Sequence, residues 1–343
     1  MQTTLLRKLM VVAVGGLIVA AAAGTQLSGQ ADRQGGAPAA PGAPAARGGR
    51  GGGGNVPQGG RGPIKVMVVT KGHTYDREPF FQMWDSWGND VTWSHVEHPA
   101  ADVMLSPKYS KLFDVYAFFD IGGPGVGMGR DGKPPQNVPG GAFKTANNRF
   151  YPPPSEQLKT EFPKLLREGK GFVFLHHASA AWTHTWPEYS EVIGGACDWY
   201  APQRVRGLDN PNHGYFGMTP QFISFVDKAH PITKGLGDGF HVTDEAYACH
   251  WFEDSVQPLA RTDFQPADAT KNLNPKVKYS NLAAWVKTAE NSPVFFTQVG
   301  HGITAWATPA YRQFVLNAIK WAASPEALSW AKANPKKIFN SSN

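Results

Sequence analysis

The chain has 343 residues, of which 41% are hydrophobic and 12% aromatic, so its composition excludes a disordered protein and provides a sizeable core. Residues 1–62 hold six of the 33 basic residues and one of the 27 acidic residues, which leaves 27 basic and 26 acidic residues, a net charge of +1, for the remainder. The basic balance therefore belongs to the N-terminal segment, and we expect no nucleic-acid partner for the folded part.

Residues 1–24 have the pattern of a secretory signal peptide. Arg7 and Lys8 precede an apolar run, residues 9–23, that ends in small residues. The run is shorter than the roughly twenty residues needed to span a bilayer. We therefore predict a secreted or periplasmic protein with no membrane span in the mature chain, an uncleaved membrane anchor being the alternative. Residues 25–62, rich in Gly, Pro and Ala, predict a flexible linker.

The next elements in the chain are apolar runs that do not alternate with polar residues. Such runs are typical of parallel strands that are covered on both faces. They predict early strands at residues 64–70, 91–96, 114–121 and 172–175, and later strands at 222–226, 256–260, 282–286 and 294–299.

Helical spacing of apolar residues separates several of these strands. It predicts helices over residues 78–87 and 155–167, the second capped by Ser155 and kinked at Pro163, and a last helix that includes residues 311–322. Residues 122–154, rich in Gly and Pro, predict a long loop. Strands alternating with helices predict a doubly wound α/β domain over residues 63–325, followed by a C-terminal tail, residues 326–343.

The two cysteines, Cys197 and Cys249, leave two alternatives open. In an oxidising compartment they can form a disulfide across 52 positions, and two buried free thiols are equally consistent with the sequence.

Polar residues follow the predicted parallel strands at four points, in loops that begin at Lys71, Asp120, His176 and Gly300. In a doubly wound sheet, ligands bind beyond the carboxyl ends of the strands. His176 follows a buried strand directly and precedes small residues that allow a sharp turn, as at the catalytic turn of many α/β enzymes. His301 and His73 occupy similar positions after other strands, so we expect these imidazoles to face one cleft.

Three segments resemble the ordered signatures of the ThuA-like (trehalose-utilisation) family: HHASAAWTHTWPEYSEVIGG at residues 176–195, HPITKGLGDGFHVTDEAY at 230–247, and FFTQVGHGITAWATPAYRQFVLNAIKWAA at 295–323. The resemblance implies a flavodoxin-like α/β/α sandwich with a mostly parallel sheet, similar to class I glutamine amidotransferases. His176 stands where those enzymes carry their nucleophilic Cys, and Cys197 and Cys249 are too far along the chain to replace it. We therefore do not expect a glutamine amidotransferase.

Family resemblance also implies a link to sugar utilisation, through sugars in which a hydroxyl is oxidised to a ketone. From placement at strand ends we assign catalytic roles to His176, Glu245 and His301: His176 and Glu245 as the proton-handling pair, and His301 with His73 to polarise a substrate oxygen or bind metal. Glu245 matches the acidic position of the family and, beside imidazoles, would act as a general base or a ligand. The remaining candidates for substrate binding are His73, Asp120, His177, Trp182, Trp186, His230, Asp244 and Tyr247.

Imidazoles and a carboxylate around one cleft also suit a divalent metal such as zinc, with His73, His176 and His301 as ligands. No Gly-x-Gly-x-x-Gly follows a strand, so we expect no nucleotide cofactor. The leading hypothesis is therefore an exported domain that acts on a carbohydrate or keto-sugar by acid–base chemistry, with or without metal: isomerisation, elimination or hydrolysis. The alternatives are a non-catalytic carbohydrate- or ligand-binding module of the cell envelope and a structural interaction domain.

Overall fold

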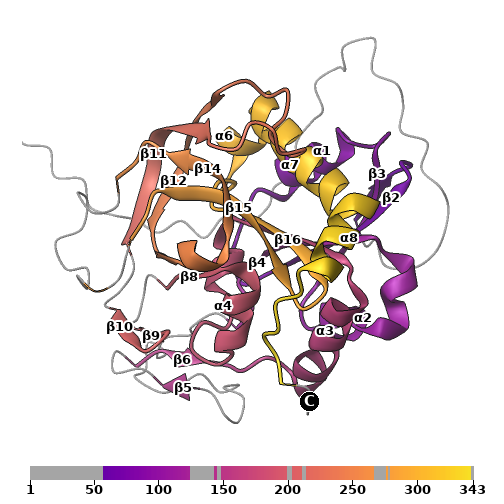
Figure 1. Ribbon diagram of the computed structural model, residues 1–343, viewed down its shortest axis with the longest axis vertical. Helices are drawn as coiled ribbons and strands as arrows, with labels where there is room; N and C mark the ends of the chain where they lie inside the picture. Colours follow the sequence, from indigo (N-terminus) through magenta and orange to yellow (C-terminus); the bar gives the residue numbers. More distant parts are fainter. Residues whose placement is uncertain are drawn as a thin grey trace, which may run out of the picture. The chain divides into compact units, whose positions relative to one another are not determined.

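The computed structural model describes residues 57–123, 143–144, 148–198, 203–210, 214–265, 276 and 279–340 (Figure 1). The chain divides into two units, residues 1–53 and residues 54–343. The predicted signal peptide and residues 25–56 of the predicted linker lie outside the described residues. Within the described part of the chain, no helix is both long and apolar enough to cross a membrane.

A ten-stranded sheet runs in the order β1-β3-β2-β4-β7-β16-β15-β14-β11-β12. Its central part is parallel and consists of β3 (Val91–Glu97), β2 (Ile64–Lys71), β4 (Val115–Asp120), β7 (Gly171–Leu175) and β16 (Ser292–Thr297). Antiparallel strands extend both edges: β1 (Gln58–Gly60) on one side, and β15 (Leu282–Ala289), β14 (Gln257–Thr262), β11 (Gly214–Phe225) and β12 (Gly239–Ala248) on the other.

Helices cover both faces of the sheet (Figure 1). One face carries α2 (Ala100–Met104), α3 (Glu156–Glu168) and α4 (Pro187–Ile193), and the other carries α1 (Arg77–Asp85), α6 (Ile303–Trp306), α7 (Pro309–Ala322) and α8 (Pro325–Ala333). Short 3-10 turns lie at η1 (Pro107–Leu112), η2 (His176–Ala180) and η3 (Glu253–Ser255). Three two-stranded sheets pair β5 (Phe143–Lys144) with β6 (Phe150–Tyr151), β8 (Gly195–Ala196) with β13 (His250–Trp251), and β9 (Gln203–Val205) with β10 (Leu208–Asn210).

The apolar run of β2 shows how the sequence builds these layers. Val66 and Val68 belong to the core beneath α1 and α7, whereas Met67 and Val69 belong to the core beneath α2 and α3. Because successive side chains of a strand point to opposite faces, a strand with no polar position must be covered on both sides. The predicted flavodoxin-like three-layer α/β/α fold is confirmed, with the parallel strands at its centre.

Helix α3 begins and ends where local chemistry predicts. The Ser155 hydroxyl accepts a hydrogen bond from the Leu158 N–H, and Gly169 ends the helix in the left-handed conformation (φ 80°). Pro163 lies inside the helix, which continues without interruption from Glu156 to Glu168. The predicted kink therefore does not divide the helix.

Both predicted domain boundaries need correction. Residues 58–60, assigned to the linker, form β1 and pair with β3. Residues 326–343, assigned to a tail, include most of α8, whose Ala327 and Ala331 are buried, and Phe339 is buried as well. The folded part therefore extends further toward each terminus. Strand β1, with the sequence QGG, has no apolar side chain and is held by backbone pairing with β3, and α8 buries only two alanines, so neither has a strong local signal.

Strand β12 was not predicted, although it carries Glu245 and Tyr247. Its first half alternates between exposed and buried residues, and its second half, Asp244–Ala248, is buried throughout. A disulfide between Cys197 and Cys249 connects the residue after β12 to the segment after β8, with 5.2 Å between the two Cα atoms. This crosslink resolves the alternatives for the cysteines and holds the end of β12 near the carboxyl ends of the parallel strands.

Candidate active site

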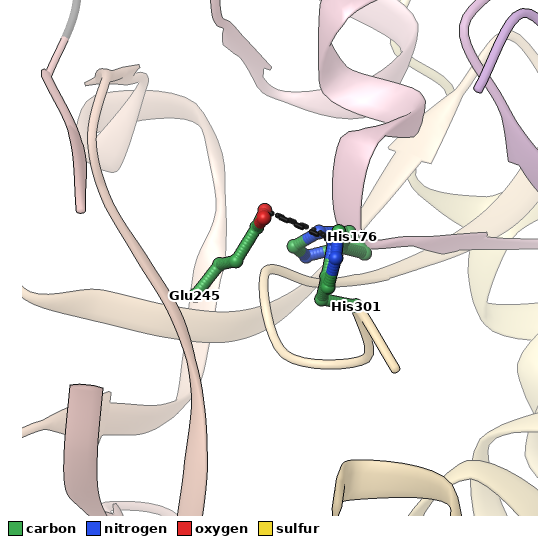
Figure 2. Close-up of side chains that lie close together, drawn as sticks. All are labelled: His176, Glu245 and His301. Atoms are coloured by element: carbon green, nitrogen blue, oxygen red, sulfur yellow. Dashed lines mark hydrogen bonds and ion pairs between the residues drawn. The ribbon is translucent and has the colours of Figure 1, made fainter. Parts of the chain in front are cut away.

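The carboxyl ends of β7 and β16 and the second half of β12 bring three predicted residues together. His176 begins the turn after β7, His301 follows β16, and Glu245 lies on β12. Figure 2 shows the three side chains pointing toward one another from these separate segments. The sheet order places β7 beside β16, so His176 and His301 meet although 125 positions separate them. In that order β12 lies beyond β15, β14 and β11, so Glu245 reaches His176 through tertiary packing and not through strand pairing.

The reactive atoms form a nearly equilateral triangle. His176 Nε2 lies 3.1 Å from Glu245 Oε2 and 3.1 Å from His301 Nδ1, and His301 Nδ1 lies 3.1 Å from Glu245 Oε2. The Tyr247 hydroxyl oxygen lies 2.6 Å from His176 Nε2 and 3.0 Å from Glu245 Oε2. Its single proton can be donated to either of these two atoms, one at a time. We call these four residues the His–Glu cluster.

Backbone contacts orient His176 within the cluster. Its Nδ1 lies 2.7 Å from the Gln298 carbonyl oxygen, which can only accept, so Nδ1 carries the proton and donates. In the neutral ring, the lone pair of Nε2 therefore points at the other members of the cluster. His176 also has a φ of 53°, a left-handed conformation that is strained for a residue other than glycine and occurs often at functional turns.

Asp244 holds the loop that carries His301. Its carboxylate accepts hydrogen bonds from the backbone N–H groups of Gly300 (2.5 Å) and His301 (3.2 Å). Gly300 has a φ of 133°, and a Cβ there would lie 2.3 Å from the Tyr311 hydroxyl oxygen. Asp244 is fully buried and contacts the loop that carries His301, whereas the sequence predicted a residue that binds substrate.

Electrostatics lower the pKa of Glu245 and raise that of the neighbouring His301. Burial alone would raise the pKa of Glu245, but hydrogen bonds and charge from His176 and His301 hold its pKa well below the usual range. Burial lowers the pKa of His301, and contact with the Glu245 carboxylate more than offsets this, so the net shift is upward. Burial raises the pKa of Asp244.

Two further imidazoles line the back of the cluster. The His73 ring lies 4.7 Å from the His177 ring and 5.3 Å from the His301 ring, measured between centroids. His73 Nδ1 and His177 Nε2 are buried and find no hydrogen-bond partner among the described residues. Burial, followed by the neighbouring imidazoles, lowers the pKa of both rings, so they are neutral near pH 7.

A cavity of about 410 Å³ opens beside His301. It is lined by Thr74, Tyr75, Asp76, Met218, His301, Gly302, Ile303, Thr304 and Trp306. The His301 side chain is 26% exposed and that of Glu245 8%, whereas His176 is fully covered. A small molecule in this cavity therefore reaches His301 first, and His176 contacts it only through its neighbours.

Several predicted substrate-binding residues lie elsewhere. Asp120 is fully buried, and its carboxylate lies 3.4 Å from His98 Nε2 on the other side of the β4 end. Trp182 and Trp186 are 4% and 5% exposed and pack with Tyr189 in the core beneath α3 and α4. The structure therefore does not bring these three predicted residues to the His–Glu cluster.

His230 also lies away from the cluster. It lines a separate hollow of about 550 Å³ with Trp321 and Trp330 of α7 and α8, and its Nδ1 accepts a hydrogen bond from the Ile232 N–H. It stabilises its own turn, and the structure does not bring it to the His–Glu cluster. Of the predicted substrate-binding set, Tyr247, His73 and His177 remain at the site.

Sequence reasoning missed the residues that support the cluster. The Gln298 carbonyl has no signal in the sequence, because any residue supplies a backbone oxygen. The pairing of Glu245 with Tyr247 could have been found, since residues two apart on a strand share a face. That inference required β12 to be recognised as a strand.

The observed strand order and the histidine at the turn after β7 define a flavodoxin-like α/β protein without a cysteine nucleophile at that turn. Residues 152–322 match the family model of ThuA, described as trehalose utilisation. The chain therefore belongs to the ThuA-like family.

Two solved structures share its fold. A ThuA-like protein from Parabacteroides merdae is 15% identical, with a TM-score of 0.53, over 76% of this chain and 90% of that one. A second ThuA-like protein, from Bacteroides uniformis, is 14% identical, with a TM-score of 0.50, over 77% of this chain and 93% of that one. The comparison with curated protein sequences found no match to this chain.

Proposed function

We propose that this ThuA-like protein is an enzyme that moves protons next to a carbonyl group of a carbohydrate or keto-sugar derivative. The observation that carries the proposal is a series of contacts that begins at one cavity: His301 lines the cavity, Glu245 contacts His301 from behind, and the Tyr247 hydroxyl donates to Glu245. Imidazole accepts and returns protons near neutral pH, and a carboxylate beside it orients the ring and stabilises its charged form.

The groups differ in their access to a substrate. His301 borders the cavity and would contact the substrate, while Glu245 lies directly behind it. His176 is covered and would act as a positioning residue that orients Glu245 and Tyr247 through its Nε2. This differs from the expectation that His176 handles the proton itself.

The cavity lining supports a polar, ring-shaped substrate. Thr74, Asp76 and Thr304 offer groups that bond hydroxyls, and Tyr75 and Trp306 offer aromatic surface. The family description, trehalose utilisation, points to the same class of substrate. The cavity volume, about 410 Å³, lies in the range of sites for small organic ligands.

The test is exchange of carbon-bound hydrogen in D₂O. The protein is incubated with trehalose, other disaccharides and their ketone-oxidised forms, and deuterium beside the carbonyl is followed by NMR. We expect exchange or product formation with an oxidised sugar, reduced about 10²–10⁴-fold in Glu245→Gln and His301→Gln. The matched control is His241→Gln, which alters an exposed histidine of β12.

Unchanged sugar with no exchange contradicts the enzyme proposal. If the sugar nevertheless binds, and His301→Gln weakens that binding, the cavity belongs to a binding module instead. Exchange that is equal in the wild type and both cluster variants would remove the His–Glu cluster from the reaction.

We further propose that the protein acts after export. Support comes from the charged and apolar order of residues 1–24 and from the Cys197–Cys249 disulfide, since structural disulfides persist in oxidising compartments. Fractionation of the producing cells, with N-terminal sequencing of the recovered protein, should find a chain that begins near residue 25 outside the cytoplasm. An intact Met1 terminus in the cytoplasmic fraction would contradict export.

A further inference from the structure

We propose that His176, Glu245 and His301 bind a divalent transition metal of the zinc type. The inference goes beyond the proposed function, because it concerns an ion and can be tested without a substrate. It also changes the ligand set expected from the sequence: Glu245 takes the place assigned to His73, whose ring stands beside His301.

The geometry of the triangle is the first argument. Zinc binds imidazole nitrogens and carboxylate oxygens at about 2.0–2.1 Å, and in a tetrahedral site such ligands are about 3.3–3.4 Å apart. The three ligand atoms here are 3.1 Å apart in each pair. One ion can therefore lie at bonding distance from all three atoms, and a movement of a few tenths of an ångström would give them the separations of a tetrahedral site.

The distribution of protons is the second argument. His176 Nδ1 donates its proton to the Gln298 carbonyl, so the Nε2 of the neutral ring directs its lone pair at Glu245 and His301. The 3.1 Å contact between His176 Nε2 and Glu245 Oε2 then joins two acceptor atoms, and the single proton of the Tyr247 hydroxyl can serve only one of them. A cation bound by the three ligand atoms would remove this conflict and leave the Tyr247 hydroxyl to donate to Glu245.

The surroundings provide the outer contacts that metal ligands need. The Gln298 carbonyl sets the tautomer of His176, Tyr247 contacts Glu245, and Asp244 fixes the loop that carries His301. The set of two histidines and one glutamate with a neighbouring cavity is typical of catalytic zinc sites, in which the fourth position stays open. A metal there would polarise a substrate oxygen in the cavity.

The experiment loads the purified full-length protein with Zn²⁺, removes excess by dialysis and measures metal by plasma mass spectrometry. We expect about one equivalent per chain in the wild type and in His241→Gln, and little in Glu245→Gln and His301→Ala. His301 is partly exposed, so His301→Ala is the variant that should keep the fold, which circular dichroism checks. Substitution with Co²⁺ should give the intense visible absorption of a four-coordinate site.

Asp244→Asn tests the outer contacts separately. This change keeps one acceptor for the loop but removes the charge, and we expect Zn²⁺ affinity to fall about 10–100-fold with the stoichiometry unchanged. Equal Zn²⁺ content in the wild type and His301→Ala, or a wild type that holds no Zn²⁺, Co²⁺ or Mn²⁺ after loading, overturns the metal proposal. Turnover by metal-free protein would overturn only the catalytic use of the ion, and bound metal without turnover would leave the proposed enzyme activity as the part that failed.

Discussion

At the scale of single residues, the molecule contains a second buried charged group, separate from the His–Glu cluster. His98 lies between two carboxylates, with Nδ1 2.5 Å from Asp102 and Nε2 3.4 Å from Asp120. The Ser155 hydroxyl donates to the other oxygen of Asp102 and thereby links this group to the start of α3. Burial lowers the pKa of His98, but the two carboxylates more than offset this and raise the pKa to about 9.

This group makes stability depend on pH in a defined direction. The pKa of His98 is 6.5 in the unfolded reference and about 9 in the folded protein, so its stabilising contribution is complete below pH 6.5 and is lost as the pH rises to about 9. We expect the difference in unfolding free energy between wild type and His98→Gln to shrink by about 3 kcal/mol across that range. Urea titrations at several pH values measure it. A difference that stays constant with pH would show that His98 is neutral in the folded state.

At the scale of elements, the approach of α7 to β7 depends on a glycine. A Cβ at Gly171, the first residue of β7, would lie 2.4 Å from the backbone oxygen of Ala322, the last residue of α7. The atom that would clash belongs to a backbone, so it cannot rotate away. The close contact between strand and helix sets the position from which His176 emerges five residues later.

We therefore expect Gly171→Ala to lower the free energy of unfolding by about 1–3 kcal/mol. The matched control is Gly217→Ala in β11, where a Cβ meets no atom within 4 Å, and its effect should stay within about 0.5 kcal/mol. Denaturant unfolding of the two variants tests the comparison. Equal stabilities would mean that α7 can move away from the sheet at no cost.

At the scale of the whole molecule, a disulfide joins the end of β12, in the antiparallel part of the sheet, to the segment that follows β8. The Cys197–Cys249 disulfide closes a segment with a sequence separation of 52 and lies next to the β8–β13 pair. It thereby holds the end of β12, with Glu245 and Tyr247, against the turn that carries His176.

We expect the double variant Cys197→Ala with Cys249→Ala to lose about 2–4 kcal/mol of stability, because the unfolded chain gains conformational freedom. A reductant should lower the melting temperature of the wild type and leave that of the double variant unchanged. If the reductant affects both proteins alike, the disulfide does not account for the loss.

The sequence was sufficient to predict those strands and helices whose signal lies within a short segment. Continuous apolar runs identified four of the five parallel strands at the centre of the sheet, and the fifth, β3, was predicted as a strand without such a run. The Ser155 cap identified the start of α3, and helical spacing identified α7. The strand-end rule then selected His176 and His301 as neighbours before any contact was known. These predictions succeeded because propensity, burial pattern and strand direction are properties of short segments.

Only the tertiary structure decided which side chain at a strand end faces the cleft. His176 and His177 are adjacent, yet only His176 joins the triangle, and Asp120 turns to His98. Strand β12 was missed because its two halves have different burial patterns, one half exposed at the edge and the other covered. Glu245, and not the expected His73, completes the triangle with His176 and His301 because long-range packing brings the covered half of β12 to the ends of β7 and β16. No local sequence pattern records that approach.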